Sequence, residues 1–525
     1  GQILVDNHPT YVLTVIPAEM RDREKEFDRI EQIAGISAEQ LNLNYRKYYR
    51  GKFNSTRLAK DLGINQLSRL AEHKAELPGI NYEQFPERFY PGKVRASHVL
   101  GYIREVDDRF LTTSAQSGEY RIGDIKGWQG LEKTYENILR GQDGVRYVQV
   151  DAFGRVVGDF SPEKNSKPIP GDDIYLTIDS DIQKLVEDET RDCVGAIIVA
   201  EPHSGEILAI ASYPDYPPDL FTGMTLDVEW LSYAQNEDKP MVNRIINGTY
   251  PPGSTFKPIV TLGLLTKNLV DTSKTIVCTG KYRLGRRTFD CWNTAGHGQV
   301  NMRKAVEQSC NVYFYNMMQL IDLDDWAVIA RSFGFGQVTG IDLPAELSGV
   351  IPDKNFMDEK YGKSGWTKGH ILNMGIGQGD ILVTPIQMAN YINQIATSGN
   401  AGTLHLLLDG SRPPSSNPQF QESEWAVLTS FMRGVNLSEH GTGRSAHPKR
   451  IAGMITAGKT GTAENPHGEP HAWYVGWAEK NGHLITVTIL IENGGHGGDV
   501  AAPVARKIFT LFDEKYCSDS LAEKN

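Results

Sequence analysis

Three short motifs in this chain carry residues that could perform acyl transfer. The first is Ser254-Thr255-Phe256-Lys257. Residues three apart share one face of a helix, so the Lys257 amine can lie beside the Ser254 hydroxyl. A serine hydroxyl becomes a strong nucleophile when a base takes its proton, and a partly buried amine with a lowered pKa can be that base. The motif therefore predicts a Ser254 nucleophile that Lys257 activates.

The second motif is Ser309-Cys310-Asn311, which begins 55 residues after Ser254. We expect the Ser309 hydroxyl to relay a proton between Lys257 and a leaving amine. The Asn311 amide offers both a donor and an acceptor, so it can orient a substrate amide. These residue types therefore fit the proton transfer and the substrate alignment that acyl transfer requires.

The third motif is Lys459-Thr460-Gly461-Thr462, which begins 205 residues after Ser254. Lys459 would add positive charge to the site, and the Thr460 and Thr462 hydroxyls can bind a carboxylate. Gly461 has no side chain and would let a strand edge approach a substrate backbone closely. The backbone N–H groups of Ser254 and Thr462 would form an oxyanion hole.

Each motif alone has a simpler interpretation. Ser161-Pro162-Glu163-Lys164 repeats the first spacing in a Pro-rich stretch without apolar periodicity, and we interpret it as accidental. A Ser-x-Asn triplet is often a polar helix face, and Lys-Thr-Gly-Thr is often a turn that opens a strand. Their joint order, spacing and placement favour a single acyl-transfer site.

The motifs need elements that bring them together. A helix is expected to begin near Ser254, because Pro258 cannot donate a helical N–H. A second helix is expected over residues 302–317. Apolar runs predict four strands, at residues 196–200, 207–211, 473–477 and 483–491. Early strands, a helical middle and late strands predict one mixed sheet with helices packed on it.

The length of 525 residues predicts two or more domains. Residues 161–172 contain three Pro, two Ser, two Lys and one Gly, which is typical of a linker. We therefore predict an N-terminal domain over residues 1–165 and a C-terminal domain over residues 166–525. The net charge of −11 argues against nucleic acid as the main partner. The sequence has no apolar run of about 18 residues that would span a membrane.

Cys278, Cys291, His297 and Cys310 fall within 33 residues. Three thiolates and an imidazole are ligands that close a tetrahedral structural zinc site. Cys310 lies inside the Ser309 motif, so a bound metal would fix the orientation of that turn. A disulfide between two of the cysteines, or free buried thiols, are the alternatives.

With these motifs the chain resembles the class B penicillin-binding proteins, and above all their elongation-type members. The resemblance covers nearly the whole chain. Its supporting stretches are Gly127-Trp-Gln-Gly-Leu-Glu-Lys-Thr-Tyr-Glu, Gly248-Thr-Tyr-Pro-Pro-Gly-Ser-Thr-Phe-Lys-Pro, Gly296-His-Gly-Gln-Val-Asn and Asn373-Met-Gly-Ile-Gly-Gln-Gly.

The resemblance implies an α+β fold. A non-catalytic N-terminal pedestal would precede a transpeptidase domain of the penicillin-binding and serine β-lactamase type, a mixed sheet flanked by helices. It further implies that the D-Ala-D-Ala end of a peptidoglycan stem peptide acylates Ser254, that D-Ala leaves, and that an acceptor amine forms the cross-link. β-Lactams would acylate the same serine, and the acyl transfer itself would need no cofactor.

The resemblance also implies a location and partners. It implies a periplasmic protein held in the inner membrane by an N-terminal helix that is absent from this chain. A membrane glycosyltransferase would supply lipid-linked precursor, and other elongation-complex proteins would bind as well. The implied role is cell-wall elongation.

Two rival functions stay open at this point. A β-lactamase or D,D-carboxypeptidase would need a base for rapid deacylation, commonly a Glu, and no clear motif for one stands between Ser309 and Lys459. A non-catalytic penicillin-sensing or scaffold protein would suit the exposed N-terminal segments, but the intact motifs argue against it. The lifetime of a penicilloyl-enzyme distinguishes a transpeptidase from the first rival, and cross-link formation distinguishes it from the second.

Overall fold

The structure is a computed structural model that describes residues 1–114, 119–121, 123–151, 156–221, 227–408 and 418–517. The chain divides into two compact units. The first comprises Gly1–Ile174 and Pro217–Leu231, and the second comprises Tyr175–Tyr216 and Ser232–Asn525. The predicted division after residue 165 stays a prediction, and no sequence signal indicated that 217–231 would join the first unit.

The first unit contains a three-stranded antiparallel sheet in the order β2-β1-β3. Leu13 and Val15 of its central strand point inward and pack with Phe27 and Ile30 of the first helix, and all four side chains are buried. Its strands are β1 (Asp6–Val15), β2 (Thr56–Ala59) and β3 (Ile80–Phe89), and the helices of this part of the unit are α1 (Arg23–Ala34), α2 (Ala38–Tyr48) and α3 (Ile64–Glu72). The apolar run of residues 11–16, a pattern typical of a strand, lies in β1 up to Val15.

The rest of the first unit is made of short elements. They are α4 (Ser97–Leu100), β4 (Ile103–Glu105), α5 (Asp108–Thr113), β5 (Ile125–Gly127), α6 (Gly130–Thr134), α7 (Glu136–Leu139), β6 (Val148–Val150) and β7 (Val156–Asp159). β4 pairs with β5 and β6 pairs with β7, each antiparallel.

The second unit is organised around a five-stranded sheet in the order β14-β15-β16-β8-β9. The strands are β8 (Gly195–Ala200), β9 (Ile207–Tyr213), β14 (Ile455–Ala463), β15 (His471–Lys480) and β16 (His483–Ile491). All four predicted strands are confirmed, and the sheet is built from both ends of the unit as expected. One detail was wrong: every neighbouring pair is antiparallel, so the sheet is not mixed. Short turns join β8 to β9 and β14 to β15 to β16, and such turns can only connect antiparallel strands.

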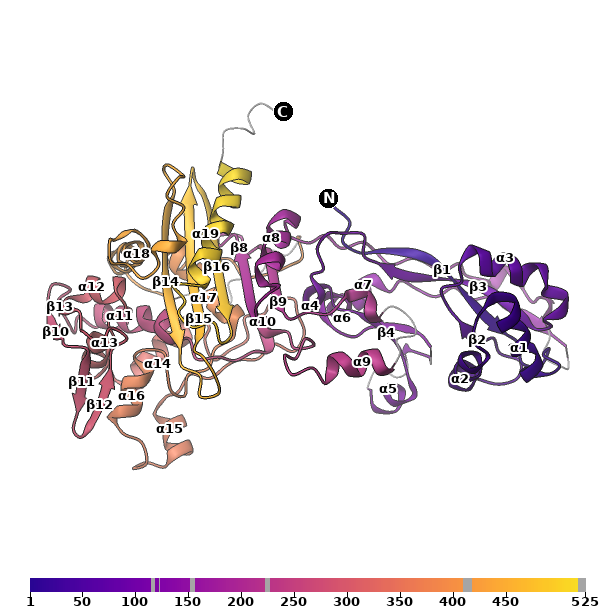
Figure 1. Cartoon of the computed structure of the whole chain (residues 1–525), viewed down its shortest axis with the longest axis horizontal. Coiled ribbons are helices and arrows are strands. Elements are labelled where there is room, and N and C mark those ends of the chain that lie inside the picture. Colours follow the sequence, from indigo (N-terminus) through magenta and orange to yellow (C-terminus); the bar gives the residue numbers. More distant parts are fainter. Residues whose placement is uncertain (115–118, 122, 152–155, 222–226, 409–417, 518–525) are drawn as a thin grey trace. The chain divides into compact units, whose positions relative to one another are not determined.

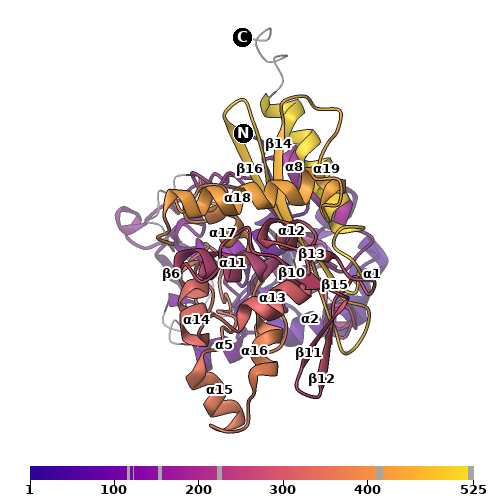
Figure 2. The same cartoon turned by 90° about the vertical axis from the view of Figure 1, so that its left-hand side faces the viewer.

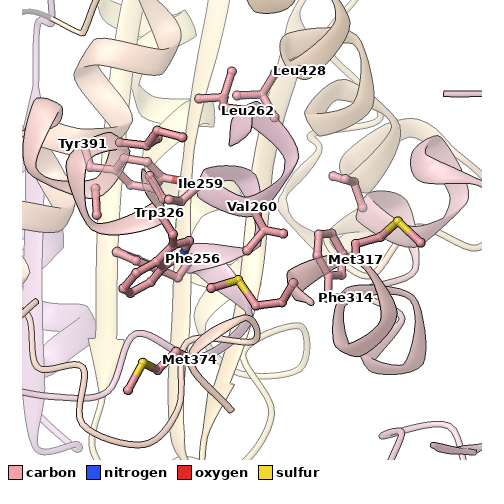
Figure 3. Close-up of a cluster of buried hydrophobic side chains, with 14 of the residues drawn as sticks. Phe256, Ile259, Val260, Leu262, Phe314, Met317, Trp326, Met374, Tyr391 and Leu428 are labelled. Carbon is pink, nitrogen blue, oxygen red and sulfur yellow. The ribbon is translucent and has the colours of Figure 1, made fainter. Parts of the chain in front are cut away.

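Helices cover both faces of this sheet (Figure 1). Side chains alternate along a strand, so Tyr474 faces one layer while Trp473 and Val475 face the other. The first layer consists of α8 (Ser180–Thr190) and α19 (Ala501–Phe512). The second layer contains the larger core, in which Phe256 and Trp326 pack edge to face (Figure 3).

The helices of the second layer surround the N-terminal end of one buried helix, α11 (Lys257–Thr266). They are α12 (Met302–Glu307), α13 (Asn311–Met318), α14 (Leu323–Ser332), α17 (Pro385–Ala396) and α18 (Glu422–Leu437), with α15 (Lys354–Tyr361) and α16 (Lys368–Met374) further out (Figure 2). The remaining elements of this unit are α9 (Asp227–Ala234), which begins in the first unit, α10 (Arg244–Asn247), and the short strands β10 (Ile276–Cys278), β11 (Lys281–Leu284), β12 (Arg287–Asp290) and β13 (Gly298–Val300).

No helix among the described residues has the length and apolar character that crossing a membrane requires.

The helix expected over residues 302–317 is broken in two. α12 ends at Glu307 and α13 begins at Asn311, because Ser309 between them adopts the left-handed conformation with φ of 54°. A non-glycine residue in this region costs on the order of 1 kcal/mol, so the surrounding contacts must hold it there. The break places Ser309 in a turn, with its side chain buried.

Candidate active site and metal centre

Ser254 lies in the one-turn 3-10 helix Gly253–Phe256, which continues directly into α11. A helix start near Ser254 is therefore confirmed. Gly253 has φ of 56°, and a Cβ there would lie 2.8 Å from the carbonyl oxygen of Thr462. A Cβ on Gly377 would lie 2.0 Å from the carbonyl oxygen of Gly253. The Gly253–Phe256 turn that carries Ser254 is thus packed between the β14 backbone and the Gly377 loop, with no room for side chains at either glycine.

Lys257 joins the Gly253–Phe256 turn to the Ser309 motif. Its side chain is 0% exposed. Its Nζ lies 2.8 Å from the Ser309 carbonyl oxygen, 2.7 Å from Asn311 Oδ1 and 3.1 Å from Ser309 Oγ. The structure therefore brings together the lysine of the first motif and both polar side chains of the second.

Burial lowers the pKa of Lys257 to about 8, by removing water from the charged form. A neutral amine has two N–H donors and one lone pair. The Ser309 carbonyl and Asn311 Oδ1 can accept both N–H groups, which leaves the lone pair free. A proton can then enter at this lone pair, and the hydroxyl of Ser309 is within hydrogen-bonding distance of it.

Lys459 approaches the same hydroxyl from the sheet. Its Nζ lies 2.9 Å from Ser309 Oγ and 3.1 Å from the Thr460 carbonyl oxygen. Its pKa is lowered well below the usual value, first by burial and then by the positive charge of Lys257. Two buried amines therefore share one hydroxyl.

The side chains that follow Lys459 are also placed around this region. The Thr460 hydroxyl lies 2.6 Å from that of Thr442, and Thr462 Oγ1 lies 3.4 Å from His496 Nδ1. Gly461 lies in β14, an edge strand of the sheet, and its predicted role beside a substrate backbone stays a prediction. A Cβ there would lie 2.9 Å from Thr255 Cγ2, so this glycine also allows β14 to pack against the Gly253–Phe256 turn.

A triad that sequence reasoning missed, the buried Arg244 and Tyr250 with the partly exposed Glu492, anchors the chain just before Ser254. Glu492 Oε1 accepts a hydrogen bond of 2.6 Å from the Tyr250 hydroxyl and pairs at 2.8 Å with Arg244 Nε. The backbone of Tyr250 exchanges two hydrogen bonds of 2.9 Å with Val383. Trp473 Nε1 donates to the carbonyl of Pro251 at 3.1 Å. The Tyr-Pro-Pro-Gly segment is therefore fixed from three sides, and the only available signal was the charge of Arg244 and Glu492, 248 residues apart.

The four cluster residues Cys278, Cys291, His297 and Cys310, here called the Cys3His cluster, are buried and converge. One ligand atom from each lies within 4.8 Å of the others. His297 Nδ1 lies 3.5 Å from Cys278 Sγ and 3.6 Å from Cys291 Sγ. Zinc–sulfur bonds of about 2.3 Å and zinc–nitrogen bonds of about 2.05 Å at a tetrahedral angle require about 3.6 Å between these atoms. The spacing therefore fits a tetrahedral metal ion, and the cluster can hold one.

The electrostatics of the cluster suit a metal as well. A hydrogen bond from the Cys310 thiol lowers the pKa of Cys291 to about 3, while the same contact and burial raise the pKa of Cys310. Thiolate is the form of cysteine that binds metals. All five cysteines of the chain are free thiols in this structure, so the disulfide alternative is not realised in it. His297 Nε2 is buried and has no hydrogen-bond partner among the described residues.

Comparisons with known proteins agree with this architecture. Residues 195–510 match the penicillin binding protein transpeptidase domain, and residues 1–176 match the penicillin-binding protein dimerisation domain. The chain is 30% identical to peptidoglycan D,D-transpeptidase MrdA of Acinetobacter baumannii, over 97% of this chain and 78% of that protein. It is also similar to a chain in the complex of penicillin-binding protein PBP2 with MreC from Helicobacter pylori (TM-score 0.84, 28% identity, 97% of this chain and 96% of that chain). A third similar chain belongs to a peptidoglycan synthase complex that coordinates polymerization and crosslinking (TM-score 0.76, 27% identity, 99% of this chain and 89% of that chain).

Proposed function

This chain belongs to the class B penicillin-binding proteins, the peptidoglycan D,D-transpeptidases that β-lactams target, and we propose that Ser254 is its nucleophile. The observation that carries the assignment of residues is the convergence of Lys257, Lys459 and Asn311 on the Ser309 turn. Three motifs that are far apart in the sequence supply one hydrogen-bonded network. That network lies one helical turn from Ser254.

In the acylation step, the neutral Lys257 amine takes the proton of the Ser254 hydroxyl. The Ser254 oxygen attacks the carbonyl carbon of the penultimate D-Ala, and the backbone N–H groups of Ser254 and Thr462 stabilise the oxyanion. The proton travels from Lys257 through Ser309 to the nitrogen of the terminal D-Ala. The C–N bond then breaks, and an ester to Ser254 remains.

In the second step, an acceptor amine attacks this ester. The amine loses a proton to the Lys257 network, a new amide bond forms, and Ser254 recovers its hydroxyl proton. Asn311 aligns the substrate amide, while the hydroxyls of Thr460 and Thr462 hold the substrate carboxylate. Burial of both lysines keeps water out of this region, which favours transfer to an amine over hydrolysis.

The test is Ser254→Ala in a covalent labelling assay with fluorescent penicillin. We expect complete loss of labelling and of cross-link formation, with an unchanged melting temperature. Ser161→Ala is the matched control, because Ser161 opens the second Ser-x-x-Lys copy and is not part of the network. Labelling that survives in Ser254→Ala, or that disappears in Ser161→Ala, contradicts the proposal. An acyl-enzyme that persists for hours excludes the β-lactamase alternative, and one that decays in seconds supports it.

We further propose that the Cys3His cluster binds one zinc ion in a structural role. When bound, zinc would hold the side chains of Cys278, Cys291, His297 and Cys310, and it would supply a rigid link rather than a reacting group. Metal analysis of purified protein should give one zinc per chain. Cys310→Ser should lose the metal, and Cys193→Ser, outside the cluster, should keep it. Equal zinc content in the two variants would contradict this assignment.

We propose the periplasmic face of the inner membrane as the location, with an anchor preceding this chain. The relatives named above include proteins solved with MreC and within a peptidoglycan synthase complex. By this similarity, the present chain would work in cell-wall elongation with a membrane glycosyltransferase that delivers lipid-linked precursor. Copurification of the full-length protein with such a glycosyltransferase, and its absence after deletion of residues 1–165, would test the partner proposal.

A further inference from the structure

A β-hairpin that the catalytic steps do not use projects beside the active site. It consists of β11 and β12, paired from Lys281 opposite Asp290 to Leu284 opposite Arg287. Figures 1 and 2 both place it next to α13 and α16. Tyr282 and Phe289 on its inner face pack against Tyr315 of α13, with ring centroids 5.9 and 5.5 Å apart. The hairpin is therefore held against the helix that begins at Asn311.

This hairpin and its turn are rich in positive charge. Four exposed basic side chains belong to it, Lys281, Arg283, Arg286 and Arg287. Lys281 and Arg283 lie on the outer face together with Asp290, which stands opposite Lys281, while Arg286 is in the turn and Arg287 opens β12 opposite Leu284. None of the four forms an ion pair with a residue that the structure describes. A compact cluster of unpaired positive charge stands out in a chain whose net charge is −11. Such a cluster attracts an anionic ligand.

The base of the hairpin is bonded directly to the active site. The carbonyl oxygen of Asp290, the last residue of β12, accepts hydrogen bonds from Asn311 Nδ2 at 3.4 Å and from the Tyr315 hydroxyl at 3.3 Å. A ligand that runs along the hairpin is therefore led toward the Ser309 and Asn311 side of the site.

An exposed tryptophan follows at the same base. Trp292 is 54% exposed. Its Nε1 donates a 3.0 Å hydrogen bond to the carbonyl of Gln308, the residue before Ser309, and its ring packs at 5.4 Å against that of His297. The indole is thus fixed in orientation although half of it faces solvent. A rigid, exposed aromatic face beside an active site is typical of a binding surface, and it suits the C–H-lined face of a sugar ring.

We propose that the four exposed basic side chains of the β11–β12 hairpin and Trp292 form a binding strip for an anionic glycopeptide strand, and this proposal rests on the proposed function. The four basic side chains pair with carboxylates of the stem peptides, and Trp292 stacks on a sugar of the strand. The strip delivers a polymeric substrate to Asn311. Basic residues alone would equally suit a phospholipid surface, but the hydrogen bonds to Asn311 and the fixed indole favour the substrate.

The first test neutralises the strip. The variant K281Q/R283Q/R286Q/R287Q is compared with a control variant that removes four positive charges elsewhere on the second unit, R433Q/K449Q/R450Q/R506Q. Both variants shift the net charge from −11 to −15, and all eight side chains are exposed, so both should keep the parental melting temperature. The measured quantity is the dissociation constant for soluble, uncross-linked glycan strands that carry pentapeptides.

We expect binding to weaken about tenfold in the hairpin variant at low salt, and less than twofold in the control, since four exposed charges each contribute a modest amount. The difference should shrink as salt is raised. Unchanged binding in the hairpin variant, or an equal loss in both variants, would overturn the proposal. Vesicles containing phosphatidylglycerol are the second probe, and hairpin-dependent binding to vesicles but not to glycan strands would overturn it in favour of a membrane surface.

The second test separates the sugar from the peptide. Trp292→Leu should weaken binding of a disaccharide-pentapeptide about fivefold and leave binding of the sugar-free pentapeptide unchanged, because only the sugar stacks on the indole. The hairpin variant should weaken binding of both ligands. An equal effect of Trp292→Leu on the two ligands refutes the stacking. Acylation of the unaltered protein by a small β-lactam tests the proposed function separately, so failure of the strip and failure of the nucleophile assignment give different results.

Discussion

Raising the pH from 6 to 9 should reveal the titration of Lys257 in the rate of Ser254 acylation. With a pKa of about 8, roughly one amine in ten is neutral at pH 7. At the ordinary value of 10.5 the neutral fraction at pH 7 would be about one in three thousand. Burial therefore raises the concentration of the active base by about 300-fold. We expect the acylation rate to rise about tenfold per pH unit below 8 and to level off above it.

The assay is the second-order rate of labelling by fluorescent penicillin, followed over time at each pH. Lys257→Arg provides the matched variant, because a guanidinium stays protonated throughout and should give no rise with pH. Lys164→Arg, in the second Ser-x-x-Lys copy, should retain the parental profile. A profile that is flat from pH 6 to 9, or that still climbs about tenfold between pH 8 and 9, would refute Lys257 as a buried base.

Lys459 sharpens the same prediction. Burial, and then the positive charge of Lys257, lower the pKa of Lys459 well below its usual value, whereas burial is the main cause that lowers the pKa of Lys257. In Lys459→Met the midpoint should therefore stay near 8 while the maximal rate falls, since the pair no longer shares Ser309. A midpoint that moves up by a full unit or more would show that Lys459 is charged when Lys257 titrates.

The titration of Lys257 should make the folding stability of the protein rise with pH between about 8 and 10.5. The unfolded chain holds the Lys257 proton up to pH 10.5, whereas the folded chain releases it near pH 8. The unfolded state therefore binds more protons between these values, and this residue makes stability rise with pH there by about 1.4 kcal/mol per unit. Below pH 8 the cost is constant at about 3 kcal/mol. Lys257→Met should consequently abolish acylation yet raise the melting temperature at pH 7.

Three further predictions concern the residues around this network. Ser309→Gly should abolish at least 99% of acylation activity while keeping or raising the melting temperature, because glycine accepts the left-handed backbone at no cost; a lower melting temperature than in Ser309→Ala would contradict this. Tyr250→Phe should lower the acylation rate and destabilise the fold by about 1–2 kcal/mol, measured by urea unfolding, since the partly buried Glu492 carboxylate loses one hydrogen-bond donor. Removal of metal by a chelator should lower the melting temperature and expose the Cys3His thiols to a thiol reagent, whereas Cys193→Ser should leave both responses unchanged.

Much of this fold could be predicted from the sequence, because the patterns that mark its strands and helix starts are local. Strands such as β16 (His483–Ile491) have continuous apolar runs, and Thr384 with Pro385 marks the beginning of α17 through its side-chain cap and the fixed φ of proline. The three candidate motifs could also be read from the sequence, since the spacing within each motif is short, and the catalytic roles of their residues stay a prediction. The mixed sheet was wrong because strand direction depends on how distant segments pair, which no local pattern reveals.

What escaped prediction depends on tertiary contacts. At the break of the helix, the carbonyl oxygen and the hydroxyl of Ser309 are bonded to two lysines, and helical periodicity in the sequence continues through this position unchanged. The pairing of Arg244 with Glu492 spans 248 residues, and either residue alone resembles an ordinary surface charge. The basic hairpin likewise becomes a surface only when its apolar side chains turn inward against Tyr315.

The packing of Gly253, Gly377 and Gly461 around the nucleophile has a consequence for how this enzyme can evolve under antibiotic selection. At each of these positions an added methyl group would fall within 2.9 Å of a neighbouring atom. Spontaneous mutation therefore cannot place a bulkier residue there to obstruct a drug without displacing the reactive serine. Resistance arising in this gene should concentrate at positions that surround the glycines, where side chains already exist and can be exchanged.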